Sequence, residues 1–363
     1  MGLRIRGLCY AARGLARRDF GDVAATGACS GSAITLLLGI DVGGTKTALA
    51  LGSADGQLKA RFRRPTKLSG DPIDDLREMA DDARRLVEQA GARLTDVAAV
   101  GVAVPGPLDV KAGLVLNPPN LAGWDRAPVR QILQESLGVP VHLENDANAA
   151  ALAEWRFGAG RGFRHMVYLT MSTGLGGGLV LGGRLHGGVA SSAGEVGHVP
   201  LVWDGEPCAC GLRGCLEAYI GGASWIRRLQ AETPAESRVA ALAGGVQHAR
   251  PEHVVEAARE GDAYALAELD RYNDYLARAL VQLTFVLAPE VFVLGTIPTA
   301  AGEELCLGPV RERVRAHTWG FLNENLRILP AALGDDLPYY AGWVVAGEAL
   351  GYFDEFNESS GED

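Results

Sequence analysis

Apolar runs bounded by turn residues dominate the chain from residue 36 onward. Three such runs occupy residues 36–41, 47–51 and 58–63; DVGGTK joins the first two, and Asp55-Gly56 joins the last two. Short apolar runs between turn residues are typical of β-strands, and an Asp-Gly pair between two of them is a strong hairpin signal. We therefore expect the fold to begin with three strands joined by two turns.

Longer segments show the periodicity of helices. Residues 72–90 carry apolar side chains at intervals of three and four and stop before Gly91, which predicts an amphipathic helix. By the same reasoning we expect helices at 129–137, 147–158, 224–230, 253–260, 263–287 and 341–350, and strands at 97–104, 139–143, 166–171, 178–181, 289–295 and 326–331. Strands that alternate with helices predict an α/β fold.

The arrangement of strand, glycine turn and strand occurs twice, once in each half of the chain. The first turn spans residues 41–46 (DVGGTK) and the second spans 172–177 (STGLGG). Glycines in such turns let backbone N–H groups approach a phosphate, although an ordinary hairpin turn has the same appearance. No helix comes after the first turn, which excludes a Walker A loop. The repetition predicts a duplicated fold that holds a nucleotide between its two halves.

Composition narrows the class of protein. With 363 residues, 48% of them apolar, the chain can form a large core and is expected to divide into two domains. A net charge of −10 argues against a nucleic-acid partner, and no apolar run is long enough to predict a membrane span. The cysteines at positions 9, 29 and 306 are too scattered for a disulfide framework, so we expect a reducing, cytoplasmic location.

The first 34 residues differ in character from the rest of the chain. They contain five arginines against two aspartates and show no clear period. An arginine-rich, acid-poor start is also found in targeting peptides, but this one lacks the apolar core of a secretory signal. We predict a disordered extension, or translation upstream of the true start, and exclude residues 1–34 from the fold.

Residues 195–217 concentrate side chains that bind metals. The potential ligands are His198, Cys208, Cys210 and Cys215, and glycines between the cysteines allow the chain to turn back. Three thiolates and one imidazole complete the tetrahedral set of a structural zinc site, whereas a catalytic zinc keeps one position open. Incidental cysteines beside an unrelated histidine are the alternative. We predict a structural zinc ion that shapes the loop and positions the carboxylates flanking it.

A polar triplet comes directly after the apolar run at 139–143. Glu144, Asn145 and Asp146 stand before the alanine-rich helix expected at 147–158. Polar groups at the carboxyl end of a strand are where α/β proteins place their chemistry. Asn145 or Asp146 can instead serve only as the cap of the helix, and the triplet can do both. The Gly/Pro/Asn-rich passage at 113–128 is long enough for a binding loop.

These features together resemble the ROK family of bacterial sugar kinases, within the actin-like, hexokinase-like ATPase superfamily. The motifs are DVGGTK, PNLAGW, ENDANAAALAE, STGLGGG with GGRLHGG, EVGH and CACGLRGCLE, and they extend over roughly residues 35–353. The resemblance implies an α/β fold of two actin-like (RNase H-like) lobes. Residues 35–147, completed by a C-terminal helix at 340–353, would form the small lobe, and residues 148–339 the large lobe with the zinc motif.

The resemblance also implies an activity, namely ATP-dependent phosphorylation of a hexose at its 6-hydroxyl, with glucose as the expected sugar and hence glucokinase activity. Asp146 would be the general base, and Asn145 would bind the sugar. The other sugar contacts would be Gly106, Asn120, Glu195, His198 and Glu217, with His198 using one nitrogen for zinc and the other for the sugar. The nucleotide phosphates would be held by Gly43, Gly44, Thr45, Lys46, Thr173, Gly174, Gly176 and Gly177, with Asp41 near magnesium. ATP, Mg²⁺ and Zn²⁺ are the implied cofactors, and a homodimer or homotetramer is the usual assembly.

Two segments depart from the family pattern. Leu294-Gly295-Thr296 stands where a strand usually runs into a pair of glycines, and the segment before the last helix, at 335–350, is bulkier than usual. Both are expected on the nucleotide side, where they affect adenine contacts and the choice of phosphoryl donor.

Other activities remain open at this point. Kinases of N-acetylglucosamine, N-acetylmannosamine or fructose share the family, as does a class of sugar-sensing regulators. A regulator needs a helix-turn-helix domain ahead of the first strand, and residues 1–34 show no such pattern. A sugar-binding protein that has lost turnover is the third alternative, which ATP consumption would exclude.

Overall fold

The early apolar runs form a five-stranded sheet in this computed structural model, which describes residues 35–118 and 120–353. Its strands are β1 (Leu36–Val42), β2 (Lys46–Ser53), β3 (Leu58–Pro65), β4 (Val97–Val104) and β7 (Val141–Asn145), in the order β3-β2-β1-β4-β7. β1, β2 and β3 pair antiparallel, whereas β4 is parallel to both β1 and β7. The carboxyl ends of β1, β4 and β7 therefore lie at one edge of the sheet.

A second sheet repeats this topology with four strands. They are β8 (Met166–Met171), β9 (Leu175–Val180), β10 (Val291–Thr296) and β11 (Arg327–Pro330), in the order β11-β10-β8-β9. β8 and β9 form an antiparallel hairpin as β1 and β2 do, and β8, β10 and β11 run parallel. Two short strands, β5 (Leu108–Asp109) and β6 (Leu114–Val115), form a separate ribbon.

The helices match the periodicity of the sequence and begin at polar caps where the sequence offers them. The carboxylate of Asp71 accepts from the Ile73 N–H at the start of α1, and that of Asp262 accepts from the Ala265 N–H at the start of α8. The helices are α1 (Pro72–Gln89), α2 (Val129–Leu137), α3 (Asp146–Phe157), α4 (Leu216–Ile220), α5 (Gly222–Glu232), α6 (Arg238–Ala243), α7 (Pro251–Arg259), α8 (Ala263–Leu287), α9 (Ile297–Gly302), α10 (Gly308–His317), α11 (Gly320–Asn325) and α12 (Leu337–Ala349). Within 35–118 and 120–353, none of the helices has both the length and the apolar character needed to cross a membrane.

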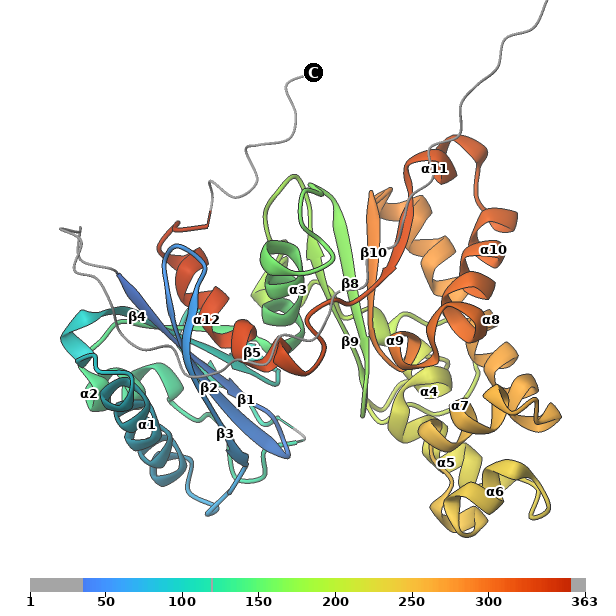
Figure 1. The fold of residues 1–363 in the computed structure, drawn as a ribbon, viewed down its shortest axis with the longest axis horizontal. Helices are drawn as coiled ribbons and strands as arrows, with labels where there is room; N and C mark the ends of the chain where they lie inside the picture. The colour runs from blue at the N-terminus through green and yellow to red at the C-terminus, as the bar shows by residue number, and fades with distance from the viewer. Residues whose placement is uncertain (1–34, 119, 354–363) are drawn as a thin grey trace, which may run out of the picture. The chain divides into compact units, whose positions relative to one another are not determined.

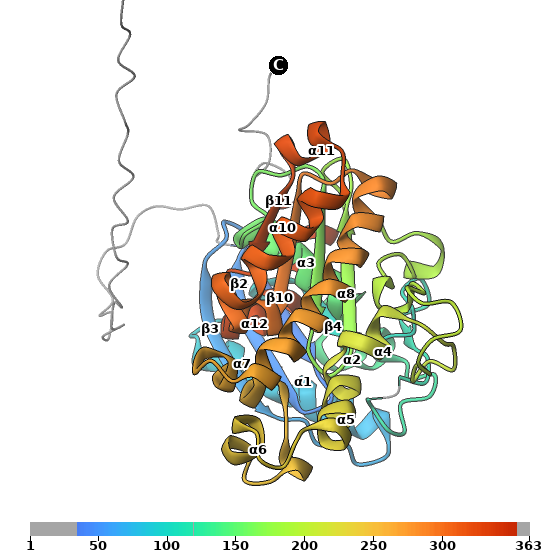
Figure 2. The same ribbon diagram turned by 90° about the vertical axis from the view of Figure 1, so that its right-hand side faces the viewer.

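Three apolar clusters separate helices and sheets into layers. One lies between the first sheet and α1 and α2, a second between the two sheets around α3 and α12, and a third between the second sheet and the helices α4 to α10. Figures 1 and 2 show this order, with α12 on the side of the first sheet opposite α1. Leu38, Ile40 and Val42 face α1, whereas Leu37 faces the inner layer. Because side chains alternate along a strand, Asp41 also points toward the inner layer.

Close backbone contact holds α12 against the first sheet. A Cβ atom on Gly39 of β1 would stand 2.2 Å from the backbone nitrogen of Trp343. One on Gly101 of β4 would stand 2.1 Å from the carbonyl oxygen of Gly342. Glycine at both positions lets the helix backbone touch the sheet. The Trp343 indole is fully buried and covers Gly52 of β2. The large Trp343 side chain of the segment 335–350 is therefore accommodated in the apolar layer between the two sheets.

Several element boundaries differ from the sequence predictions. β9 begins at Leu175 rather than at 178, because Gly176 and Gly177 continue the ladder with β8 instead of forming a turn. β7 ends at Asn145 rather than at 143, and α3 begins at Asp146. The short helices α4, α6, α9, α10 and α11 were not predicted, since few of them carry two full turns of apolar spacing. The predictions for residues 1–34 and for the acidic tail lie outside the described residues.

Candidate active site

The polar triplet lies at the junction of β7 and α3. Asn145 caps the helix, with its Oδ1 accepting from the N–H groups of Ala147 at 2.9 Å and Asn148 at 3.2 Å. Asp146 Oδ1 accepts from the Ala147 N–H at 2.9 Å. The amide nitrogen of Asn145 lies beside Gly106, where a Cβ atom would be 3.3 Å from it. The triplet therefore caps the helix and places the side chain of Asn145 next to Gly106.

Three carboxylates from distant parts of the chain influence one another at this junction. Burial raises the pKa of Asp146 above its ordinary value, the Ala147 N–H opposes that change, and the charge of Glu195 raises the pKa further. Burial likewise raises the pKa of Asp41 to about 8, with an added contribution from Asp146 and an opposing one from the Arg63 guanidinium. Asp41, Asp146 and Glu195 therefore converge on one region, and two of them hold protons more tightly than ordinary carboxylates do.

We predict that Asp41→Asn stabilises the ligand-free protein, by an amount that grows as the pH rises from 4 to 8. An aspartate in the unfolded chain ionises near its ordinary pKa of 3.8, whereas burial raises the pKa of Asp41 in the native protein to about 8. In this window the unfolded state binds fewer protons, so the wild type loses stability as the pH rises and the asparagine variant does not. Thermal unfolding of both proteins at pH 5 and pH 8.5 measures the difference. A stability gain of equal size at both pH values would contradict the burial of this carboxylate.

The first glycine turn connects β1 to β2 and presents open backbone. Gly43 donates its N–H to the Lys46 carbonyl at 3.0 Å, and the side chains of Thr45 and Lys46 are exposed. Gly44 lies against Asn120: a Cβ atom on Gly44 would stand 3.2 Å from the Asn120 Cβ and from its carbonyl oxygen. Within the described chain, the side chains of Thr45, Lys46 and Asn120 form no hydrogen bond or ion pair, so their polar groups are available to a ligand.

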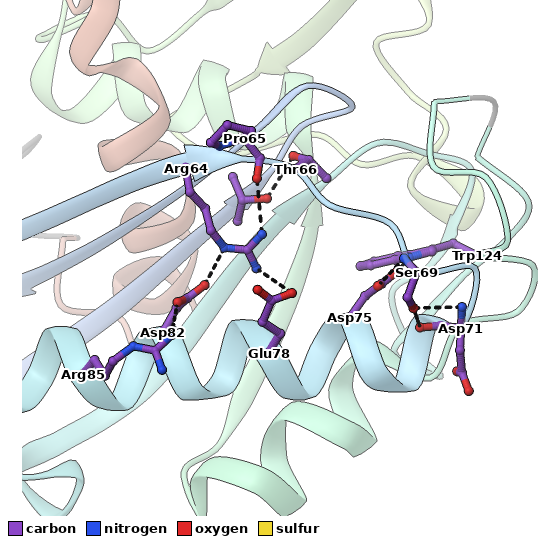
Figure 3. A network of polar contacts seen from close by, with 11 residues as sticks. Arg64, Pro65, Thr66, Ser69, Asp71, Asp75, Glu78, Asp82, Arg85 and Trp124 are labelled. Carbon is purple, nitrogen blue, oxygen red and sulfur yellow. Dashed lines mark hydrogen bonds and ion pairs between the residues drawn. The ribbon is translucent and has the colours of Figure 1, made fainter.

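The loop that carries Asn120 is fastened to α1, and the first glycine turn is fastened to the segment that follows β3. The buried Trp124 indole donates to Asp75 at 3.0 Å, and the other oxygen of Asp75 accepts from the Ser69 N–H at 2.8 Å. Thr66 Oγ1 donates to the Gly43 carbonyl at 2.6 Å. Figure 3 shows Asp75 between Trp124 and Ser69 at the start of α1, and further along this helix Asp82, which accepts from Arg64 at 2.5 Å. The sequence predicted none of these contacts, because most of the pairs are far apart in the chain.

The second glycine turn is narrower than predicted and is held by α5. Ser172 donates its N–H to the Gly174 carbonyl at 3.0 Å, which closes the turn. The first N–H groups of α5, those of Gly222 and Ala223, donate to the carbonyls of Ser172 and Thr173 at 2.9 and 2.8 Å. Gly176 and Gly177, further along the motif, lie in β9. A Cβ atom on Gly176 would be 2.9 Å from the Ala147 Cβ, so this glycine lets α3 approach the strand.

The four predicted metal ligands lie together. The Nδ1 atom of His198 and the sulfur of Cys208 are 3.8 Å apart, as are the sulfurs of Cys210 and Cys215, and all four ligand atoms lie within 4.8 Å of one another. Four ligands about 2.3 Å from a zinc ion stand about 3.8 Å apart in a tetrahedron. The donor set and its spacing therefore fit one tetrahedral zinc ion.

Carboxylates flank this cluster on two sides. The Nε2 atom of His198 lies 3.9 Å from the Glu195 carboxylate, on the side of the ring opposite the cysteines. Glu217 lies 3.7 Å from the Cys208 sulfur and accepts from the Leu175 N–H at 2.8 Å. A Cβ atom on Gly174 would be 2.7 Å from Glu217, so the second glycine turn is packed against this carboxylate. Residues 195–217, the cysteine loop, thus join Glu195, His198 and Glu217 to the second glycine turn.

Comparisons with known proteins show which family the chain resembles along most of its length. The model of the ROK family matches residues 37–342. A glucokinase of Thermotoga maritima is 39% identical over 318 residues, which is 87% of this chain and 98% of the relative. Among solved structures, a ROK hexokinase from Thermus thermophilus has a TM-score of 0.75 and 33% identity, covering 87% of this chain and 99% of its own. A ROK family glucokinase from Streptomyces griseus, solved in complex with glucose and AMPPNP, has a TM-score of 0.72 and 32% identity, covering 86% and 99%.

The duplicated sheets, each opened by a hairpin around a glycine turn, define an actin-like ATPase fold, as the solved relatives do. The chain belongs to the ROK family. The family and the fold class predicted from the sequence motifs are thereby confirmed.

Proposed function

We propose that this protein is a sugar kinase that transfers the γ-phosphate of ATP to the 6-hydroxyl of glucose. The observation that carries the proposal is the convergence of Asp41, Asp146 and Glu195, from three separate segments, at the β7–α3 junction. Phosphoryl transfer to a hexose needs one carboxylate that accepts the hydroxyl proton and another near the cation bound to the phosphates. Both must lie close to the reacting hydroxyl. The identity of 39% with a glucokinase over 87% of the chain supports the choice of glucose.

Asp146 is the proposed general base. Burial raises its pKa, which makes the ionised carboxylate a stronger proton acceptor than an exposed aspartate. Its Oδ1 atom is fixed by the Ala147 N–H at 2.9 Å, so the carboxylate is held in one orientation before the sugar binds. In the proposed reaction, Asp146 accepts the proton of the 6-hydroxyl as that oxygen attacks the γ-phosphorus and ADP leaves.

The cysteine loop is proposed to hold the remaining sugar hydroxyls. Glu195 and Glu217 each accept hydrogen bonds through two oxygens, and His198 offers the ring nitrogen that faces Glu195. Gly106, Asn120 and Asn145 complete the proposed sugar pocket. His198, Cys208, Cys210 and Cys215 would hold a zinc ion, which fixes the loop that carries these groups.

The two glycine turns are proposed to bind the nucleotide phosphates. In the first turn Gly43, Gly44, Thr45 and Lys46 offer backbone N–H groups, a hydroxyl and an ammonium, and in the second Thr173 and Gly174 offer backbone N–H groups. Magnesium, when bound, neutralises phosphate charge. Asp41 is the residue of the inner layer that would reach it, after losing the proton that burial favours.

Steady-state ADP release with ATP and magnesium tests the proposal. Glucose, mannose, fructose, N-acetylglucosamine and N-acetylmannosamine are compared at equal enzyme concentration, and glucose is expected to give the highest kcat/KM. A higher kcat/KM with a 2-acetamido sugar or fructose would contradict the choice of glucose while retaining the kinase. ADP release that does not depend on any sugar, or no release at all, would contradict the kinase itself.

We also propose that the protein is a cytoplasmic homodimer or homotetramer. Three free thiols in a metal-binding arrangement support a reducing compartment. An apolar surface cluster supports the assembly, with exposed fractions of 46% for Phe285, 77% for Val286, 62% for Trp319 and 61% for Phe321. Trp319 contacts both Phe285 and Phe321, so the rings form one continuous patch of a kind that marks interaction sites.

Trp319→Asp is expected to lower the mass of the assembly, because it places a charge at the centre of this patch. Light scattering coupled to size-exclusion chromatography measures the mass. Trp203→Asp is the matched control, since Trp203 is 80% exposed and lies on the cysteine loop rather than in the segments that carry the patch. An unchanged mass for Trp319→Asp, or a monomer produced by Trp203→Asp instead, would contradict this assignment of the interface.

A further inference from the structure

Thr296 occupies the carboxyl end of β10, directly beside the entry to the second glycine turn. β10 and β8 are adjacent parallel strands, and Thr296 is paired with Met171, the last residue of β8. Ser172, Thr173 and Gly174 come next in the chain and form the turn. Thr296 therefore lies beside the residue that directly precedes the turn, although it is 124 positions away from Ser172 in the sequence.

The backbone of Thr296 has a conformation that favours glycine. Its φ is 54° and its ψ is −108°, a combination in which residues with a Cβ atom are rarely found. A β-branched residue is especially disfavoured there. The preceding residue, Gly295, is glycine for a separate reason, because a Cβ atom at that position would stand 2.9 Å from the Tyr168 hydroxyl. A strained residue beside a proposed ligand site suggests that its side chain has a role there.

The side chain of Thr296 makes a contact that glycine cannot make. Its Oγ1 donates to the Met171 carbonyl at 2.5 Å and lies 3.5 Å from the Thr170 hydroxyl. The Met171 carbonyl belongs to the same planar peptide as the Ser172 N–H, which closes the turn by donating to Gly174 at 3.0 Å. Holding that carbonyl therefore fixes the orientation of the first N–H group of the turn.

The turn is thus held from two directions. The first N–H groups of α5 hold the carbonyls of Ser172 and Thr173, and Thr296 holds the peptide that precedes them. We propose that Thr296 is a positioning residue for the nucleotide, whose hydroxyl presets the second glycine turn for phosphate binding. This inference rests on the proposed function, which assigns that turn to the phosphates of ATP. It goes beyond that function by giving a role to the threonine that replaces a glycine in the family pattern.

Because the backbone and the side chain of Thr296 have opposite effects, Thr296→Gly separates them. Glycine relieves the backbone strain, so the melting temperature is expected to stay unchanged or to rise. The loss of the hydroxyl is expected to raise the KM for ATP and the Kd for AMPPNP about fivefold, the factor that corresponds to one neutral hydrogen bond of about 1 kcal/mol. The KM for glucose is expected to change less than twofold, an effect under about 0.4 kcal/mol. Thr296→Ser keeps the hydroxyl and is expected to restore both nucleotide constants.

Thr299→Ala is the matched control. The Thr299 hydroxyl also donates to a backbone carbonyl of β10, that of Leu294 at 2.7 Å, but it does not contact the turn. This variant is expected to keep the wild-type Kd for AMPPNP whatever its melting temperature. The variants are prepared as full-length protein, and AMPPNP binding is measured by calorimetry with magnesium present.

Two results would overturn the inference. One is a Thr296→Gly variant with wild-type nucleotide constants, which would leave the hydroxyl with a structural role only. The other is a variant that melts at a lower temperature and loses glucose and nucleotide affinity together, which indicates general damage. Calorimetry also separates this inference from the proposed function. A wild type that binds AMPPNP but phosphorylates no sugar would contradict the kinase, and its comparison with Thr296→Gly would still decide the role of Thr296.

Discussion

Asp146→Asn is expected to lower kcat by about 10²–10⁴-fold, the range over which general bases contribute to catalysis. Asparagine has the same shape as aspartate and can still accept the Ala147 N–H through Oδ1, so the helix start is retained. It cannot accept a proton from the sugar. The Kd for glucose is therefore expected to remain within about fivefold of the wild type, because an exchange of a single acceptor changes binding by less than about 1 kcal/mol.

Glu144→Gln is the control for this experiment. Glu144 precedes Asp146 by two residues and its pKa is also raised by burial, but its Oε1 atom is occupied by the Asn145 N–H at 2.8 Å and the Asn148 amide at 3.0 Å. This variant is expected to retain most of the turnover. Turnover of Asp146→Asn close to that of the wild type would remove Asp146 from the mechanism, and a loss of equal size in both variants would indicate a disturbed helix start instead.

The second large effect is expected from the cysteine loop. Wild-type protein is expected to contain one zinc ion per chain, and Cys210→Ser is expected to lose it, since a serine hydroxyl is a poor zinc ligand compared with a thiolate. His198 and Glu217 then lose the framework that holds them beside the second glycine turn. Glucose affinity is expected to fall together with zinc content, by about tenfold or more, as happens when the support of a metal site is removed.

Cys306→Ser separates this effect from the loss of a buried thiol. Cys306 is fully buried in the third apolar cluster and belongs to no group of metal ligands among the described residues. Its replacement is expected to lower the melting temperature and to leave the zinc content unchanged. Metal analysis of both variants measures the outcome. A Cys210→Ser protein with wild-type zinc content would exclude the proposed site.

Local signals in the sequence were sufficient for the parts of the fold that depend on neighbouring residues. The hairpin around DVGGTK and the meeting of the four candidate metal ligands were predicted correctly in position, and the cap that Asn145 provides to α3 was one of the two roles considered for it. In each case the deciding residues lie within about two dozen positions, where turn geometry, capping and ligand spacing act directly. The second glycine motif was less well predicted, because Gly176 and Gly177 belong to β9, where Gly176 serves the contact with α3.

Residues that support the site from a distance were missed. Trp124 and Asp75 are 49 positions apart, and Thr66 and Gly43 are 23 apart, so no periodicity links them. The influence of Arg63 on the pKa of Asp41 arises from the pairing of three strands. The sequence did show a threonine at position 296, where the family usually has glycine. The role of this threonine depends on its contact with Met171, which the sequence does not reveal. Such contacts are set by the tertiary fold and carry no local signal.

Phosphorylation of glucose at the 6-hydroxyl, with ATP as donor, is the activity on which the roles of the individual residues depend. The most direct measurement quantifies glucose 6-phosphate and ADP together in one reaction of the full-length protein with glucose, ATP and magnesium. We expect the two products to appear in equal amounts, and we expect Asp146→Asn to form neither at a comparable rate. ADP without glucose 6-phosphate, or a sugar phosphate modified at another hydroxyl, would contradict this activity.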